Sequence, residues 1–191
     1  MIKKLKNKIK YRGFTLVETL VAISILSISV LGTFTAVQSS LQNSEFAKDQ
    51  ITAFYLIQES MEYIRNIRDT NGISSNNSVS SGGSAIPWLT SISNQASDPC
   101  YFGKTCTIDG TTGTSGIQTC SGGFGSCQYL RQDTVTSLFG YNSGWPVSRF
   151  KREVQIQSVS ANEVVITVSL SWLAKGSTKT LLERETLFNW H

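Results

Sequence analysis

The chain has 191 residues, of which 40% are hydrophobic and 16% are charged, and its formal net charge is +4 at pH 7. This length suits one domain, or one domain with an appendage, and the composition excludes a collagen-like repeat and a highly charged disordered chain. The single histidine is His191, which argues against a Ser-His-Asp or Cys-His catalytic system and against a multi-histidine metal site.

The positive charge is concentrated at the N-terminus. Six cations and no acid occur among the first 12 residues: Lys3, Lys4, Lys6, Lys8, Lys10 and Arg12. The rest of the chain contains the other 11 of the 17 cations and all 13 acids, so its formal net charge is −2. The slightly acidic remainder argues against a nucleic-acid partner, for which a basic surface is the usual footprint.

An apolar segment follows the basic residues directly. Between Phe14 and Ser44 the only ionisable side chain is Glu18, and Phe14–Val37 has the length of a membrane-spanning helix. The basic flank predicts residues 1–13 on the cytoplasmic side and the chain after about residue 40 outside. A cleaved secretory signal would have a shorter apolar region and a small-residue cleavage site. A plain signal anchor fits the length but leaves Glu18 without a purpose, since a carboxylate in a membrane helix is costly.

The junction between the two segments carries a resemblance. A basic leader, then Gly13-Phe14-Thr15-Leu16-Val17-Glu18, then an uninterrupted apolar run, resembles the class III signal of type IV pilins and pseudopilins. The resemblance implies that a prepilin peptidase cuts after Gly13 and N-methylates the new terminal residue, Phe14. Residues 1–13 would then be a leader that is removed.

The same resemblance gives Glu18 a role in subunit assembly. By family analogy, Glu18 of an incoming subunit neutralises the Phe14 amine of the preceding one, which would replace two buried charges by one pair. The alternative is a Glu18 that only extends toward the membrane interface.

A long helix is predicted from about Phe14 to Asp69. Residues 14–38 form its apolar half, and residues 39–69 form an amphipathic half that ends at the Asn71-Gly72 stop signal. One face of the second half carries apolar side chains at helical spacing: Ala47, Ile51, Phe54, Ile57, Met61, Ile64 and Ile67. We expect this face to pack against a sheet.

Residues 70–148 form a variable region rich in Ser and Gly, and all four cysteines lie in it. Cys100-x5-Cys106 and Cys120-x6-Cys127 enclose glycine-containing loops. These spacings and an exported location argue against zinc and favour disulfides. Three pairings are open, and we favour the two local ones. Within the region, residues 86–89 (Ile-Pro-Trp-Leu) can dock against the body of the protein.

Residues 149–191 are predicted to form an antiparallel β-meander. Apolar and polar residues alternate along about 150–157 and 164–172, and turns near Asn162 and Gly176 separate these strands from a third at about 178–188. The expected fold class is α+β and type IV pilin-like: a long N-terminal helix packed on a C-terminal antiparallel sheet of three or more strands.

The expected function is therefore structural rather than enzymatic, with no cofactor and no catalytic or metal-binding residue. The protein would be a type IV pilus subunit, most similar to PilV-like minor pilins, with a minor pseudopilin of type II secretion or a membrane-anchored exoplasmic binding module as alternatives. The implied partners are the prepilin peptidase, other pilin or pseudopilin subunits through helix packing, the inner-membrane platform protein and the assembly ATPase. The chain would reside in the cytoplasmic membrane as a single-pass protein before it reaches the pilus or cell surface.

Overall fold

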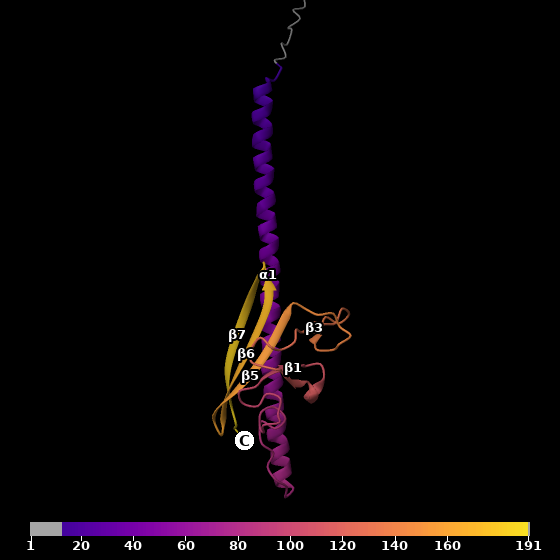
Figure 1. The fold of residues 1–191 in the computed structure, drawn as a ribbon, viewed down its shortest axis with the longest axis vertical. Coiled ribbons are helices and arrows are strands. Elements are labelled where there is room, and N and C mark those ends of the chain that lie inside the picture. The colour runs from indigo at the N-terminus through magenta and orange to yellow at the C-terminus, as the bar shows by residue number, and fades with distance from the viewer. Residues whose placement is uncertain (1–12, 191) are drawn as a thin grey trace, which may run out of the picture. The chain divides into compact units, whose positions relative to one another are not determined.

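The structure is a computed structural model that describes residues 13–190; the basic residues of the predicted leader, 1–12, lie outside the described residues, as does His191. One long helix precedes seven strands. Figure 1 shows the helix and the longer strands that follow it in the chain. The elements are α1 (Leu16–Ser80), β1 (Thr105–Ile108), the 3-10 helix η1 (Gly113–Ser115), β2 (Ile117–Thr119), β3 (Arg131–Gln132), β4 (Phe139–Gly140), β5 (Phe150–Ser160), β6 (Glu163–Ala174) and β7 (Ser177–Phe188). The chain divides into two compact units, with the boundary between Ala47 and Lys48 inside α1.

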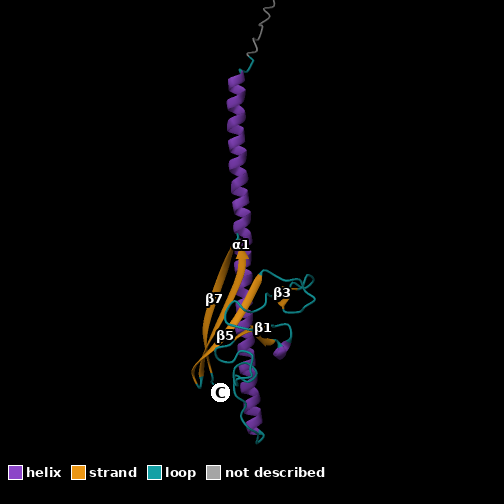
Figure 2. Cartoon of the chain, viewed as in Figure 1, coloured by secondary structure: helices purple, strands orange, loops and turns teal. Residues whose placement is uncertain are grey.

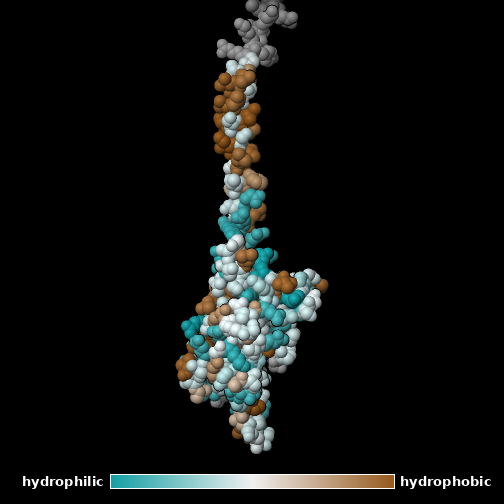
Figure 3. All heavy atoms as spheres, in the orientation of Figure 1, coloured by the Kyte–Doolittle hydropathy of each residue, from teal (hydrophilic) through white to brown (hydrophobic). Residues whose placement is uncertain are grey.

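The first unit contains the apolar half of α1. Its large hydrophobic side chains, from Phe14 to Leu41, are exposed, and Figure 3 shows them as a continuous hydrophobic surface. By length and composition, α1 contains one segment able to cross a membrane, and no residue of that segment is buried. A helix that is apolar all round needs lipid or other helices as its surroundings.

The second unit consists of residues 48–190 and holds the sheet. The main sheet has five antiparallel strands in the order β2-β1-β5-β6-β7, so the predicted β-meander is present as β5, β6 and β7 (Figure 2). In β6, the residues Val164, Ile166, Val168, Leu170 and Trp172 alternate inward and are buried. The hairpin β1–β2 adds to the free edge of β5, where Cys106 is opposite Val154. The sequence analysis did not predict these two short strands.

The helix continues 11 residues beyond the predicted end at Asp69. Asn71-Gly72 does not stop it, because the Asn71 side-chain amide donates hydrogen bonds to the carbonyls of Trp88 and Thr90, both at 3.1 Å, and Gly72 is buried. The helix ends instead at a Schellman motif. Gly82 has a φ of +80°, its N–H donates to Val79 O, and the Gly83 N–H donates to Ser78 O at 2.8 Å.

The hydrophobic core of the second unit lies between α1 and the sheet. The predicted stripe is correct from Ile57 to Ile67, because Ile57, Met61, Ile64 and Ile67 are all buried. It is wrong at its N-terminal end, where Ile51 is 58% and Phe54 is 48% exposed. The buried face there runs through Ala53 and Leu56 instead, one position off the predicted face.

Three ion pairs join α1 to the sheet or to the residue that precedes β5. Arg149 pairs with Asp49 at 2.9 Å, Arg65 with Glu185 on β7 at 2.5 Å, and Arg152 with Glu59 at 2.6 Å.

The Arg152 pair is of a different kind from the other two, because Arg152 is fully buried. Its Nη1 also donates to the Leu56 carbonyl on α1 at 2.7 Å, and its Nη2 donates to the Ile108 carbonyl at the end of β1. One guanidinium group therefore ties together α1, β1 and β5.

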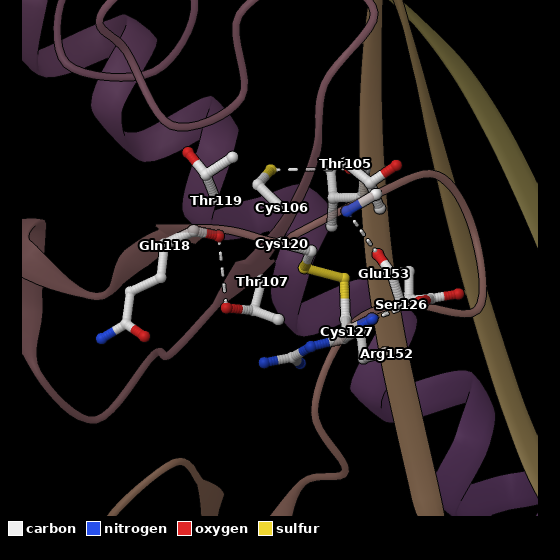
Figure 4. Close-up of a disulfide and its surroundings, with 12 residues drawn as sticks. Thr105, Cys106, Thr107, Gln118, Thr119, Cys120, Ser126, Cys127, Arg152 and Glu153 are labelled. Atoms are coloured by element: carbon white, nitrogen blue, oxygen red, sulfur yellow. Dashed lines mark hydrogen bonds between the residues drawn. A yellow bond between two sulfur atoms is a disulfide. The ribbon is translucent and has the colours of Figure 1, made fainter.

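Both disulfides lie beside β5 in the variable region. Cys100 is joined to Cys106 and Cys120 to Cys127, the two local pairings that we favoured. Figure 4 shows Glu153 of β5 next to the second disulfide. The buried Glu153 carboxylate accepts hydrogen bonds from the Gly125 N–H at 2.8 Å and from the Cys127 N–H at 3.0 Å. Because side chains alternate along a strand, Arg152 and Glu153 serve opposite faces of the sheet.

The rest of the variable region is also held by specific contacts. Segment 86–89 docks on α1 as predicted, with Leu89 buried and the Ile86 N–H donating to Ser75 Oγ at 3.0 Å. The short ribbon β3–β4 is linked to the β1–β2 hairpin by Asp109. Its Oδ2 accepts from the Tyr141 N–H at 2.8 Å, and its Oδ1 accepts from the Thr111 N–H at 2.9 Å.

Tyr141 should make the stability of this unit sensitive to alkaline pH. Burial raises the pKa of its hydroxyl from 10.0 to about 12. Folding therefore favours the protonated hydroxyl. Its contribution to the free energy of unfolding is fully present below pH 10 and is lost as the pH rises toward 12. We expect a loss of about 1 kcal/mol by pH 11. Denaturation of the wild type and of Tyr141→Phe at pH 9 and pH 11 measures this, and an equal pH effect in both proteins would contradict it.

Candidate processing and assembly site

The predicted cleavage junction lies just outside the helix. Gly13, Phe14 and Thr15 have no helical structure, and α1 begins at Leu16. Gly13 is exposed and has nothing within 4 Å of the position that a Cβ would occupy. The Phe14 side chain is 76% exposed. The Gly13–Phe14 peptide bond is therefore unobstructed within the described residues, and it does not belong to a hydrogen-bonded turn of α1.

Thr15 caps the helix that follows. Its hydroxyl accepts a hydrogen bond from the Glu18 N–H at 3.2 Å, and its carbonyl accepts from the Thr19 N–H, also at 3.2 Å. Thr15 is thus the N-cap, and Glu18 is the third helical residue. A carboxylate in the first turn also interacts favourably with the positive end of the helix dipole.

This cap corrects the predicted start of the helix. The helix was predicted to begin at about Phe14, whereas α1 begins at Leu16 and Phe14 precedes the capping residue. The Thr-x-x-Glu spacing of residues 15–18 is a capping signature that could have shown this from the sequence.

The Glu18 carboxylate has no ionic partner within the described chain. Glu18 is exposed and belongs to none of the ion pairs among residues 13–190. Farther along the apolar half, the serine hydroxyls are satisfied within the helix. Ser24, Ser27 and Ser29 each donate to the carbonyl four residues earlier, at 2.8–2.9 Å. Glu18 is the one ionisable group of this half, and its carboxylate calls for an external partner.

The described residues show no grouping suited to a metal. Among residues 13–190, no three His, Cys, Asp or Glu side chains come together as a potential metal site. The four cysteines are joined in disulfides.

The arrangement defines a class of protein: a long helix with an exposed apolar N-terminal half, packed through its C-terminal half on an antiparallel sheet, in a pilin-like α+β fold. Residues 8–34 match the family model described as the prokaryotic N-terminal methylation motif. The chain carries this motif, which is consistent with the class III signal of type IV pilins and pseudopilins. No curated protein matches the chain. No solved structure matches it either.

The match and the fold support a type IV pilin or pseudopilin family protein, a family that is structural rather than catalytic. The match covers 27 residues, and these include Gly13, Phe14 and Glu18. The motif and the long apolar helix together fit a membrane-anchored protein.

Proposed function

We propose that this protein is a minor subunit of a type IV pilus, processed at Gly13–Phe14 and assembled through the apolar half of α1. The observation that carries the proposal is the match of residues 8–34 to the N-terminal methylation motif, followed by a helix whose apolar half is wholly exposed. A prepilin peptidase would remove residues 1–13 and methylate the Phe14 amine. The platform protein and assembly ATPase of the machinery would then move the subunit from the cytoplasmic membrane into the filament.

The geometry around the junction supports processing there. Proteases need an extended, accessible peptide, and Gly13–Phe14 precedes the first turn of α1 and is exposed. The described bonds of the Thr15 cap join residues 15, 18 and 19, all of which lie after the cleavage point. Removal of the leader therefore leaves the described hydrogen bonds of the first turn in place.

The chemistry of Glu18 supports assembly through a neighbouring subunit. A carboxylate on an apolar helix costs about 2.5–3.5 kcal/mol in a membrane unless it is paired. Processing would create a cationic amine on Phe14, and methylation would keep its charge. Glu18 of one subunit and the Phe14 amine of the next would then satisfy each other.

Mass spectrometry of the mature N-terminus, from protein expressed with its machinery, tests the processing. We expect a chain that begins with N-methyl-Phe14. An intact Met1, or cleavage near residue 38, would refute the proposal. Two further measurements separate the candidate assemblies. A few copies of the protein in purified surface pili would support a minor pilin. Assembly that requires the genes of a secretion machinery would support a minor pseudopilin.

Glu18→Ala tests assembly separately from processing. We expect the variant to be inserted and trimmed but to be lost from sheared filaments, because the Phe14 amine would have no counter-charge. Thr15→Ala is the matched control, since it weakens the cap by about 1 kcal/mol and leaves the carboxylate in place. Filaments that contain Glu18→Ala at the wild-type level would rule out the pairing.

A further inference from the structure

A groove lies on the second unit between the β1–β2 hairpin and the loop after β4. Its larger part is a cleft of about 570 Å³ lined by Gln118, Tyr141, Asn142, Trp145 and the loop 109–116. A smaller cleft of about 270 Å³ shares Gln118 and Tyr141 with it and extends along the Cys120–Cys127 disulfide. The two clefts are therefore adjacent, on either side of these two residues. The larger one is within the size range of small-molecule sites.

The walls of the groove are fixed before any ligand arrives. The Asp109 carboxylate joins them, because it accepts from Thr111 on one side and from the Tyr141 N–H on the other. The Trp145 backbone is held by Arg131, whose Nη1 donates to the Trp145 carbonyl at 2.6 Å. A Cβ on Gly140 would lie 3.1 Å from the Trp145 ring, so the indole packs closely on that glycine. Such preorganisation lowers the entropy cost of binding.

The lining has a distinctive chemistry. Among the described residues that line one cleft or the other, the one carboxylate is that of Asp109, and no Lys or Arg is present. The Asp109 side chain is buried, and both of its oxygens already accept hydrogen bonds from the protein. The other polar groups are hydroxyls and amides, among them Thr112, Ser126 and Gln128. Trp145 supplies a half-buried aromatic wall. A neutral ligand with many hydroxyl groups matches this lining, because hydroxyls and amides can both donate and accept.

Gln118 lies where the two clefts meet and is available to a ligand. Its backbone carbonyl accepts from the Thr107 hydroxyl, but its side-chain amide has no hydrogen-bond partner within residues 13–190. Figure 4 shows this side chain pointing away from the disulfide and from Glu153. An exposed primary amide next to an aromatic wall can bind a pair of neighbouring hydroxyls while the indole packs against the C–H face of a sugar ring.

We propose that this groove binds a neutral saccharide. An acidic glycan or a phosphate would need a cation, and none lines the groove. Single-stranded nucleic acid would find an aromatic stacking surface but not the positive track that its backbone requires. The proposal does not depend on the pilus assignment, because it rests only on residues of the second unit.

The test is the binding of the full chain in lipid nanodiscs to an array of neutral, sialylated and sulfated glycans and a single-stranded oligonucleotide. Nanodiscs are needed because maltoside detergents are themselves saccharides. We expect retention on neutral glycans alone. Trp145→Ala and Gln118→Ala should each weaken it, with the loss of one good contact worth up to about tenfold. Trp88→Ala, at a half-buried tryptophan outside the groove, should bind as the wild type does.

Gln118→Ala keeps the test decisive if Trp145→Ala fails to fold, because the Gln118 side chain is exposed and supports nothing else in the described fold. The proposal is overturned if no neutral glycan binds more strongly to the wild type than to Gln118→Ala. It is also overturned if acidic glycans or the oligonucleotide bind best, or if Trp88→Ala weakens binding as much as Gln118→Ala does.

Discussion

Arg152→Ala is expected to lower the free energy of unfolding of the second unit by about 3–5 kcal/mol, the cost of breaking a buried ion pair by removing one partner. The side chain is fully buried and donates to Glu59, to the Leu56 carbonyl and to the Ile108 carbonyl. Alanine removes the guanidinium donor from all three acceptors, of which the Leu56 carbonyl keeps the Ser60 hydroxyl, and leaves a cavity between α1 and β5. Chemical denaturation of the oxidised full chain, followed by tryptophan fluorescence, measures the loss.

Arg149→Ala provides the matched control, because Arg149 also joins the helix to the sheet region but its side chain is 55% exposed. Exposed pairs contribute at most about 1 kcal/mol, so this variant should be close to the wild type. Glu59→Gln should fall between the two, since an amide oxygen can still accept from Arg152. If Arg152→Ala and Arg149→Ala lost similar stability, the central role of the buried guanidinium would be wrong.

Glu153→Ala is expected to cost about 3 kcal/mol, because two backbone N–H groups would lose a charged acceptor. Those groups belong to Gly125 and Cys127 in the loop closed by the second disulfide. The loop is therefore held both covalently and by the carboxylate. Denaturation at pH 7 under oxidising conditions measures the effect.

A double-mutant cycle separates the two restraints on this loop. The double substitution Cys120→Ser with Cys127→Ser should cost about 2–3 kcal/mol by itself. Combined with Glu153→Ala, the effects should not add, because both restraints act on the same eight-residue loop, 120–127. Glu153→Gln keeps one acceptor oxygen and should retain part of the stability. Strict additivity would show that the carboxylate and the disulfide act independently.

The parts of the fold that follow a strong period were predictable. The alternation of β6 and the turns near Asn162 and Gly176 identify the meander, and the apolar run identifies the first half of α1. The end of the helix was not predictable from local signals. Asn71 and Gly72 continue the helix because segment 86–90 supplies acceptors for the Asn71 amide, a contact between residues that are 17 and 19 positions apart.

The burial of Arg152 follows from the alternation of inward and outward residues along β5, although the sequence analysis did not predict it. The alternation predicted along about 150–157 places position 152 on the same face of β5 as Phe150, Val154 and Ile156. A charged residue at that position suggests a buried pair, and Glu59 supplies it. The choice of Glu59 over other acids could not be read from the sequence, because it depends on how α1 lies against β5.

The candidate sites divide in the same way. Gly13, Phe14 and Glu18 lie within one six-residue motif, so the sequence alone is enough to predict them as a site, and the Thr15 cap was visible in the same six residues. The groove was not predicted. Gln118 lies on the short strand β2 and Trp145 lies in the loop after β4, in a region with no period. The Asp109 hydrogen bonds that bring these segments together are a property of the folded chain.

The Thr15 cap also bears on how deeply the chain sits in a bilayer. The first four N–H groups of a helix lack acceptors within it, and the Thr15 hydroxyl satisfies that of Glu18 alone. Hydrocarbon offers no substitute acceptor, so the first turn must lie at headgroup depth, where water can reach it. A helix that enters the hydrocarbon at Leu16 needs about 20 residues, at about 1.5 Å each, to cross it, and so leaves it near Thr35. In a bilayer, the N–H groups that Thr15 leaves without acceptors thus set which residues emerge on the far side.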